Sequence, residues 1–235
     1  MATLHQRIVD GRTDLVFDLV AGGEAATTSI DDYPLIGWCA YYGDVSAIRF
    51  LVASGALLES VGENLGFNTA CYHGHWRLCE YLIENGADVN FAEVETGETP
   101  LHNVLAKANR WKYTPIVKLL LAHCADPNRA TTAGKETGAF MRDCRTKGET
   151  PLHRAAAFGN EEDIQSLLDA GAKIDARDAN GDTPLSWASW YLRPGAVLSL
   201  LCHGGYRLHP RYKKNTTCEP ADGSMERTLL GRPNC

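Results

Sequence analysis

The chain has 235 residues, of which 44% are hydrophobic and 22% charged, and its formal net charge is −6. This composition is that of a globular protein long enough to bury a sizeable core. The acidic balance disfavours nonspecific binding to nucleic acid, and no apolar run approaches the roughly 18 residues that a membrane span requires.

The eight cysteines do not form a metal-binding pattern. No Cys-x-x-Cys pair occurs, so a zinc site is unsupported. Cys39, Cys71 and Cys79 fall among apolar positions, where thiols act as small hydrophobic side chains. The N-terminal residues also lack the basic and then apolar layout of a signal peptide. We therefore expect no metal, no cofactor and a reducing, cytoplasmic location.

A repeated motif organises the chain. Thr150-Pro-Leu-His153 is followed by Gly181-Asp-Thr-Pro-Leu-Ser186, and Thr150 and Thr183 are 33 residues apart. Thr150 is suited to cap a helix that starts at Pro151 and ends at Gly159. Ile164, Leu167 and Leu168 are spaced as one face of a second helix. Such a unit cannot bury its apolar face alone, so it must stack on copies of itself.

A Thr-Pro-Leu-His-x-Ala signature that recurs at about 33 residues resembles the ankyrin repeat family. The resemblance implies an all-α fold: an ankyrin-repeat solenoid of about six helix-turn-helix repeats with short β-turn fingers and one long finger insertion. It covers residues 1–213, and residues 214–235 are predicted to be a C-terminal tail or cap. The expected repeats span 1–30, 31–62, 63–95, 96–130, 147–179 and 180–213.

The early repeats depart from the family pattern. Thr3-Leu4-His5 stands in place of the full motif in the first repeat, which suits an end cap. Leu65-Gly-Phe-Asn68 replaces the motif in the third. In the fourth, about four extra residues around 109–113 are expected to lie between the two helices.

The segment 131–146 is the insertion. Glycines at 134 and 138 favour a loop or an extended hairpin. We expect Phe140 and Met141 to dock if the insertion is ordered, and its arginines Arg142 and Arg145 to add positive charge beside the concave face. A mobile, tolerated insertion is an equally good interpretation.

The motif histidines His5, His102 and His153 invite a metal or catalytic interpretation. In the family that the sequence resembles, this histidine hydrogen-bonds to the backbone of neighbouring fingers, so we assign these three a structural role.

The resemblance also indicates a binding surface, since the two residues before the end of each first helix face the concave side, where partners bind. Aromatic residues are frequent at these positions, and such residues supply binding energy at low entropic cost. The candidate partner-binding residues are Tyr41, Tyr42, Tyr72, His73, Lys107, Phe158, Trp190 and Tyr191, with Trp38 and Trp187 one helical turn earlier as secondary candidates. The alternative is that some of these rings only fill gaps between helices.

We therefore expect a protein-interaction scaffold or adaptor, a monomer that binds an unidentified protein or peptide and neither nucleic acid nor membrane. No known nucleophile, metal-protease or phosphate-binding motif is present, and no catalytic residue is assigned. A small-molecule or enzymatic pocket, formed where the insertion covers the groove, is the alternative function. A self-association surface is a third interpretation of the aromatic stripe.

Overall fold

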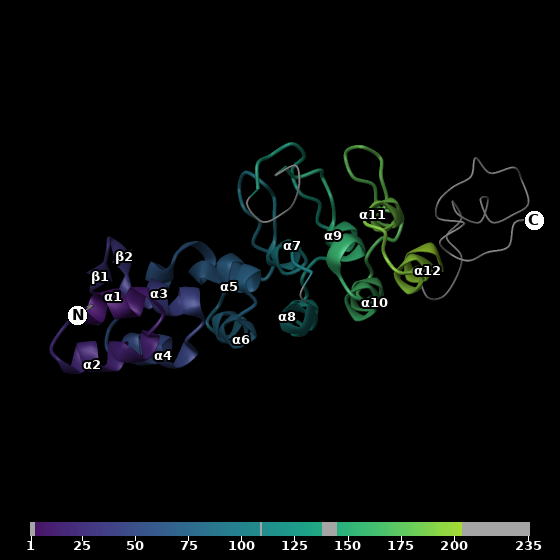
Figure 1. The fold of residues 1–235 in the computed structure, drawn as a ribbon. Helices are drawn as coiled ribbons and strands as arrows, with labels where there is room; N and C mark the ends of the chain where they lie inside the picture. Colours follow the sequence, from purple (N-terminus) through teal and green to yellow (C-terminus); the bar gives the residue numbers. More distant parts are fainter. Residues whose placement is uncertain (1–2, 109, 138–144, 204–235) are drawn as a thin grey trace, which may run out of the picture. The chain divides into compact units, whose positions relative to one another are not determined.

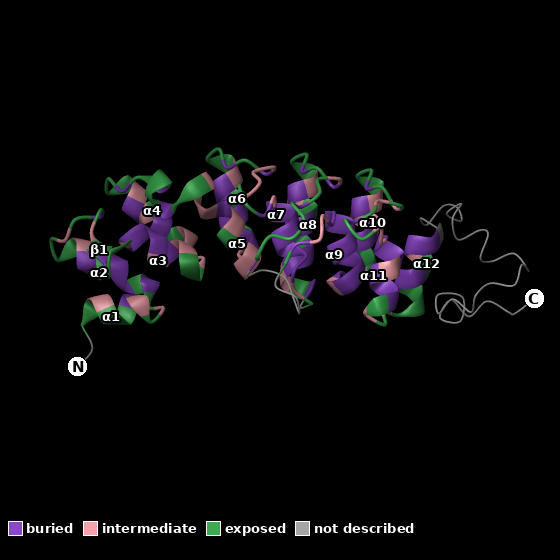
Figure 2. Ribbon diagram, turned by 90° about the horizontal axis from the view of Figure 1, so that it is seen from above, coloured by how far each residue is buried: buried purple, intermediate pink, exposed green. Residues whose placement is uncertain are grey.

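The computed structural model describes residues 3–108, 110–137 and 145–203. It divides into two units, residues 1–91 and 92–235, which are described separately. In each unit helices follow one another in pairs, with the first helices in one row and the second helices in another (Figure 1). Buried residues lie where these helices face each other (Figure 2).

The first unit contains three helix pairs and one short hairpin. Its elements are α1 (Leu4–Val9), a 3-10 turn (Thr13–Leu15), α2 (Val16–Ala21), β1 (Ser29–Ile30), β2 (Tyr33–Pro34), α3 (Leu35–Tyr42), α4 (Val45–Ala53), two more 3-10 turns (Leu58–Val61 and Glu63–Gly66), α5 (Phe67–His73) and α6 (Trp76–Glu84). The strands pair antiparallel, with Ser29 opposite Pro34 and Ile30 opposite Tyr33.

Local sequence explains where the first-unit helices end. Gly43 and Gly74 close α3 and α5 in the left-handed conformation, at φ 75° and 77°. Glycine adopts these angles without a steric penalty, and each then satisfies carbonyls of the last turn. Asp44 caps the start of α4 by accepting a hydrogen bond from the Ala47 N–H. The turns are thus encoded by single residues.

The second unit, as far as it is described, contains three further helix pairs. They are α7 (Pro100–Val104) with α8 (Arg110–Ala122), α9 (Pro151–Phe158) with α10 (Glu161–Asp169), and α11 (Pro184–Trp190) with α12 (Gly195–His203). Thr99, Thr150 and Thr183 cap α7, α9 and α11, and a proline follows each. The predicted start of α9 is therefore confirmed.

Two details differ from the sequence prediction. The extra residues of the fourth repeat do not form a separate loop, because α8 begins at Arg110 and runs for 13 residues with Pro115 inside it. Pro115 lies in the second turn, where an absent N–H removes only one helical hydrogen bond. Gly159 ends α9 in an extended conformation, at φ −64° and ψ 168°, instead of a left-handed one.

The core is made by the apolar positions that the helical spacing predicted. Leu82 of α6 and Leu167 of α10 are both fully buried, as are Ile48 and Leu51 of α4. Cys39, Cys71 and Cys79 are buried thiols, as expected. Burial of such side chains supplies about 1.5–3 kcal/mol each relative to full exposure, which holds neighbouring pairs together.

Candidate functional site

Rings of the first unit form a connected group, here called the aromatic cluster: Tyr33, Trp38, Tyr41, Tyr42, Tyr72 and His73. They come from β2, α3 and α5, whose ends lie side by side. Tyr41 is central, with ring centroids 5.1 Å from Tyr42, 5.0 Å from His73 and 6.4 Å from Trp38. Tyr33 packs on Trp38 at 5.3 Å, and Tyr72 on His73 at 5.3 Å. All these contacts are edge-to-face, the geometry that aromatic pairs favour.

The aromatic cluster remains accessible to solvent. Tyr33, Tyr41 and Tyr42 are 39%, 46% and 38% exposed, and Trp38, Tyr72 and His73 are half-buried. Most large apolar side chains of this fold are buried, so a group of neighbouring exposed rings is a candidate binding surface.

Hydrogen bonds hold the rings in place. The Tyr42 hydroxyl donates to the Val9 carbonyl at 2.7 Å, and Trp38 Nε1 donates to the Ile30 carbonyl at 3.3 Å. His75 Nε2 lies 3.0 Å from the Tyr41 carbonyl and donates to it. A surface whose side chains are already ordered loses less entropy when a partner binds.

In the second unit the predicted residues form a smaller patch, the second aromatic patch: Phe158, Trp190 and Tyr191. Phe158 and Tyr191 pack at 5.2 Å between centroids, and Trp190 is 60% exposed. Lys107 is half-buried and lies beyond the end of α7, where its carbonyl accepts a hydrogen bond from Arg110. The structure thus brings the aromatic candidates other than Trp187 together in two groups, one within each unit.

Trp187 is a correction to the predicted surface. Its side chain is 2% exposed. Nε1 donates to Asp178 at 3.1 Å, and the ring packs edge-on against His153 at 5.4 Å between centroids. The residue lies in the first turn of α11 beneath a finger, so its ring is enclosed by the fold.

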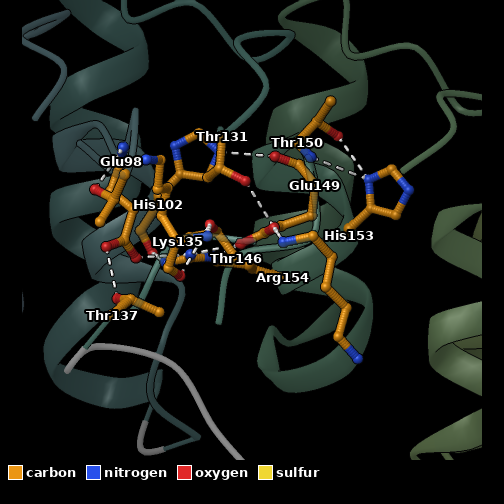
Figure 3. Close-up of polar contacts among 12 residues, drawn as sticks. Glu98, His102, Thr131, Lys135, Thr137, Thr146, Glu149, Thr150, His153 and Arg154 are labelled. Carbon is orange, nitrogen blue, oxygen red and sulfur yellow. Dashed lines mark hydrogen bonds and ion pairs between the residues drawn. The ribbon is translucent and has the colours of Figure 1, made fainter. Parts of the chain in front are cut away.

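The fingers of the second unit are joined by buried charges that the sequence analysis did not single out. Arg154 is fully buried, with Nη2 at 2.5 Å from Glu149 Oε1 and 2.7 Å from Glu98 Oε1. Its Nη1 donates to the His102 carbonyl at 3.2 Å. Figure 3 shows these three residues, Glu98, Arg154 and Glu149, here called the buried triad, near the two motif histidines. One signal was present: Gly-Glu-Thr-Pro-Leu-His occurs at both 97–102 and 148–153.

The triad also anchors the stem of the insertion (Figure 3). The Thr137 hydroxyl donates to Glu98 at 2.6 Å, and the Thr131 hydroxyl donates to Glu149 at 2.7 Å. Burial alone raises the pKa of Glu149. The Arg154 charge, the Lys147 N–H and the Thr131 hydroxyl outweigh burial and lower that pKa to about 2. Glu149 is therefore a structural carboxylate that stays ionised.

Two motif histidines have the structural role that was predicted. Nε2 of His102 donates to the Glu149 carbonyl at 3.2 Å, and Nε2 of His153 donates to the Asp182 carbonyl at 3.1 Å. Their Nδ1 atoms accept the N–H of Thr99 and of Thr150. Burial, aided by the Arg154 charge, lowers the pKa of His102 to about 3, and burial also lowers the pKa of His153. His5 differs: its ring contacts the Glu24 carboxylate at 3.0 Å at the surface of the first unit.

The insertion begins and ends as a hairpin, one of the two predicted forms. Glu136 and Arg145 form an antiparallel bridge, and the Gly134 N–H donates to the Thr146 carbonyl at 2.7 Å. Arg145 is exposed and lies 3.7 Å from the Glu136 carboxylate. Arg142, Phe140 and Met141 lie outside the described residues, so the pocket beneath the insertion stays a prediction.

A second buried ion pair joins α8 to α10. Arg110 Nε lies 2.7 Å from Asp163 Oδ2, and its Nη1 donates to the carbonyls of Val104 and Lys107.

Arg193 donates to the carbonyls of Ala157 and Gly159 at the end of α9. These contacts satisfy the last carbonyls of α9, which explains why Gly159 need not adopt the left-handed conformation.

No group of three or more His, Cys, Asp or Glu side chains among the described residues is placed to hold a metal ion. None of their helices is long and apolar enough to cross a membrane.

Stacked helix pairs, polar fingers and motif histidines bonded to the next finger define a helical repeat protein. The family model for ankyrin repeats (three copies) matches residues 36–131, 67–178 and 132–211. The chain therefore belongs to the ankyrin repeat family. Ankyrin repeats indicate a protein–protein interaction domain.

Curated relatives share the repeats at low identity. The chain is 26% identical to palmitoyltransferase ZDHHC13 of Mus musculus over 188 residues, 72% of this chain and 30% of that protein. It is 29% identical to ankyrin repeat and SOCS box protein 3 of Bos taurus, over 68% of this chain and 34% of that protein. Rabankyrin-5 of Homo sapiens is 32% identical over 51% of this chain and 10% of its own length. The chain thus spans about a third or less of these relatives.

Proposed function

We propose that this chain is a binding module that holds a protein or peptide partner through the aromatic cluster, with the second aromatic patch as a further contact. One observation carries the proposal: solvent-accessible rings of α3 and α5 contact one another, and two of them, Trp38 and Tyr42, are fixed by hydrogen bonds to backbone carbonyls. Rigid aromatic side chains dominate the energetics of many protein interfaces.

The relatives support binding through the repeats more than any shared chemistry. One relative is named a palmitoyltransferase and another a SOCS box protein, and what they have in common with this chain is the repeat region. Such a region serves proteins of different activities because the partner is chosen by surface residues and not by the fold.

A paired-variant capture experiment tests the proposal. Tyr41→Ala with Trp190→Ala removes one exposed ring from each group, at positions 46% and 60% exposed. The matched control is Trp76→Ala with Trp111→Ala, which removes two exposed rings from α6 and α8, at 46% and 75%. Each variant is used to capture proteins from a lysate of the source cells, with quantitative mass spectrometry as the readout.

We expect a partner that the wild type and the control variant capture equally and that the Tyr41/Trp190 variant loses about tenfold or more, since central interface rings each contribute about 2 kcal/mol or more. Thermal unfolding of all three proteins checks that the fold is retained. Equal capture by both variants would show that these rings are not the binding surface.

A further inference from the structure

The first unit carries a strong excess of negative charge. Residues 1–91 contain twelve Asp and Glu, four Arg and no Lys, whereas residues 92–235 contain 17 Asp and Glu against 19 Lys and Arg. The acidity of the whole chain therefore originates in the unit that bears the aromatic cluster. A surface within such a unit attracts cations and repels acidic partners.

Three of the four arginines of this unit are engaged away from the aromatic cluster. Arg12 forms an ion pair with Asp14, with Nη2 and Oδ2 2.7 Å apart. Arg49 of α4 lies over the Tyr81 ring, and Arg77 of α6 lies over the Trp76 ring, at 5.1 and 5.2 Å from the centroids. These last two belong to the second row of helices, whereas the cluster belongs to the first. The charges of Arg49 and Arg77 therefore do not lie beside the rings of the aromatic cluster.

A two-residue acidic turn borders the aromatic cluster. Asp31 and Asp32 connect β1 to β2, both exposed and both at positive φ, 52° and 60°. Tyr33 follows directly and packs on Trp38. Among the described residues neither of the two carboxylates has a hydrogen-bond or ion-pair partner. Two carboxylates thus stand free next to exposed rings.

We infer that the aromatic cluster and this acidic turn together bind a positively charged peptide segment, with Arg or Lys side chains against the ring faces and their charges near Asp31 and Asp32. This inference rests on the proposed function and specifies its partner. A cation over an aromatic face contributes about 0.5–2 kcal/mol, and Arg stacks best because its guanidinium is flat and weakly hydrated.

The spacing of the rings indicates how the basic residues are arranged. Neighbouring centroids from Tyr33 through Trp38, Tyr41 and His73 are 5.3, 6.4 and 5.0 Å apart. In an extended peptide, side chains that point the same way are about 7 Å apart, because each residue rises about 3.3 Å. The steps between centroids are shorter than this spacing, so a pair of alternate residues can reach two neighbouring rings, and a partner with Arg or Lys at two alternate positions fits.

Selection from a random 12-residue peptide display library tests the inference without knowledge of the natural partner. The full chain is the target, and the variant Tyr41→Ala with Tyr72→Ala is used for counter-selection. We expect enriched peptides that are rich in Arg and Lys and absent when the rings are removed. Enrichment of neutral or acidic peptides that require the rings would overturn the charge inference and leave the binding surface standing. If no enriched peptide depends on the rings, both proposals are wrong.

A synthetic peptide from the selection then tests the acidic turn. Asp31→Asn with Asp32→Asn removes both charges and keeps residues that tolerate positive φ. We expect the dissociation constant to rise about fivefold or more at low salt, and the difference to shrink as salt screens the charges. The matched control, Glu80→Gln with Glu84→Gln, removes two exposed charges from α6 and should leave affinity within about twofold of wild type. Equal losses in both variants would show a general charge effect and refute the role of the turn.

Discussion

The two units join their repeats in different ways. In the second unit, motif histidines hydrogen-bond to the neighbouring finger, and the buried triad of Glu98, Arg154 and Glu149 links the finger before α7 to the finger before α9. In the first unit, where Thr-Pro-Leu-His is absent or incomplete, side chains near the turns between paired helices make the links: Tyr42 to Val9, His75 to Tyr41, and Thr13 to Asp44. Buried charged side chains therefore link the fingers of the second unit, whereas aromatic and polar side chains at the helix ends link the repeats of the first unit.

This difference has a functional consequence. Residues enclosed by a finger network cannot contact a partner, as Trp187 shows, because its ring is committed to Asp178 and His153. The rings of the first unit are held only at their edges or their hydroxyls, so their faces stay accessible. Departure from the repeat motif thus coincides with the larger candidate binding surface.

The largest expected effect comes from breaking the buried triad. Arg154→Met removes the guanidinium that pairs with Glu98 and Glu149 and leaves two buried carboxylates without that charge. We expect the free energy of unfolding of the second unit to fall by about 3–5 kcal/mol, the usual loss when one partner of a buried ion pair is removed. Chemical denaturation followed by circular dichroism measures this loss.

Arg77→Met is the control from the first unit, because it removes an exposed arginine whose guanidinium lies over the exposed Trp76 ring. It should lower stability by about 0.5–1 kcal/mol at most. Adding Glu98→Gln and Glu149→Gln to Arg154→Met should restore part of the loss, since neutral side chains no longer repel. A loss below about 1 kcal/mol for Arg154→Met alone would mean that the triad does not hold the fingers.

The fold was predictable because its signals are local and repeated. Thr150 and Pro151 specify a capped helix without reference to the rest of the chain, and the family resemblance implied the bond of His153 to the neighbouring finger; the structure confirms both. The burial of Leu82 and Leu167 followed from helical spacing alone. The burial of Trp187 was not predictable in this way, because the same spacing suits an exposed ring and a ring beneath a finger.

The buried triad was missed for a related reason. A charged residue in a sequence is most often solvated, so Glu98 and Arg154 gave no sign of burial. Only the three-dimensional approach of two fingers, 51 residues apart in sequence, places Glu98 and Glu149 on the same guanidinium. The recurrence of glutamate before Thr-Pro-Leu-His was visible, but its meaning depends on a contact between repeats.

A smaller effect is expected from mild acid, between pH 6.5 and 4.5, again in the second unit. The pKa of His102 is lowered to about 3 in the folded state from an ordinary value of 6.5. Below pH 6.5 His102 binds a proton in the unfolded chain but stays neutral in the folded protein, so the free energy of unfolding falls as the pH falls toward 3. The pKa of Glu149 is lowered to about 2 from 4.5, which adds a further loss below about pH 4.5. Each uncompensated proton reduces stability by about 1.4 kcal/mol per pH unit.

His102→Gln isolates the contribution of this histidine to the pH dependence of stability. Between pH 6.5 and 4.5 the free energy of unfolding of the variant should fall less steeply with decreasing pH than that of wild type, by up to about 1.4 kcal/mol per pH unit, which corresponds to one proton. At pH 8 the variant should be less stable than wild type, because the finger bond is altered. Trp76→Ala in the first unit is the control, because the exposed indole carries no ionisable group, and we expect it to leave the slope as in wild type. An unchanged slope in His102→Gln would exclude His102 as a source of acid sensitivity.

The smallest expected effect concerns the hydroxyl that joins the first two helix pairs. Tyr42→Phe removes the hydrogen bond to the Val9 carbonyl and keeps the ring packed on Tyr41. Because Tyr42 is 38% exposed, water replaces the lost donor, and stability should fall by only about 0.5–1 kcal/mol. Hydrogen exchange of the α1 amides is the more sensitive measurement, since this helix has six residues, buries only Ile8 among them, and is therefore expected to open locally. Tyr41→Phe, which removes a hydroxyl from the adjacent ring, should leave α1 exchange unchanged. If both variants speed exchange equally, the rings and not the hydroxyl join the first repeat to the second.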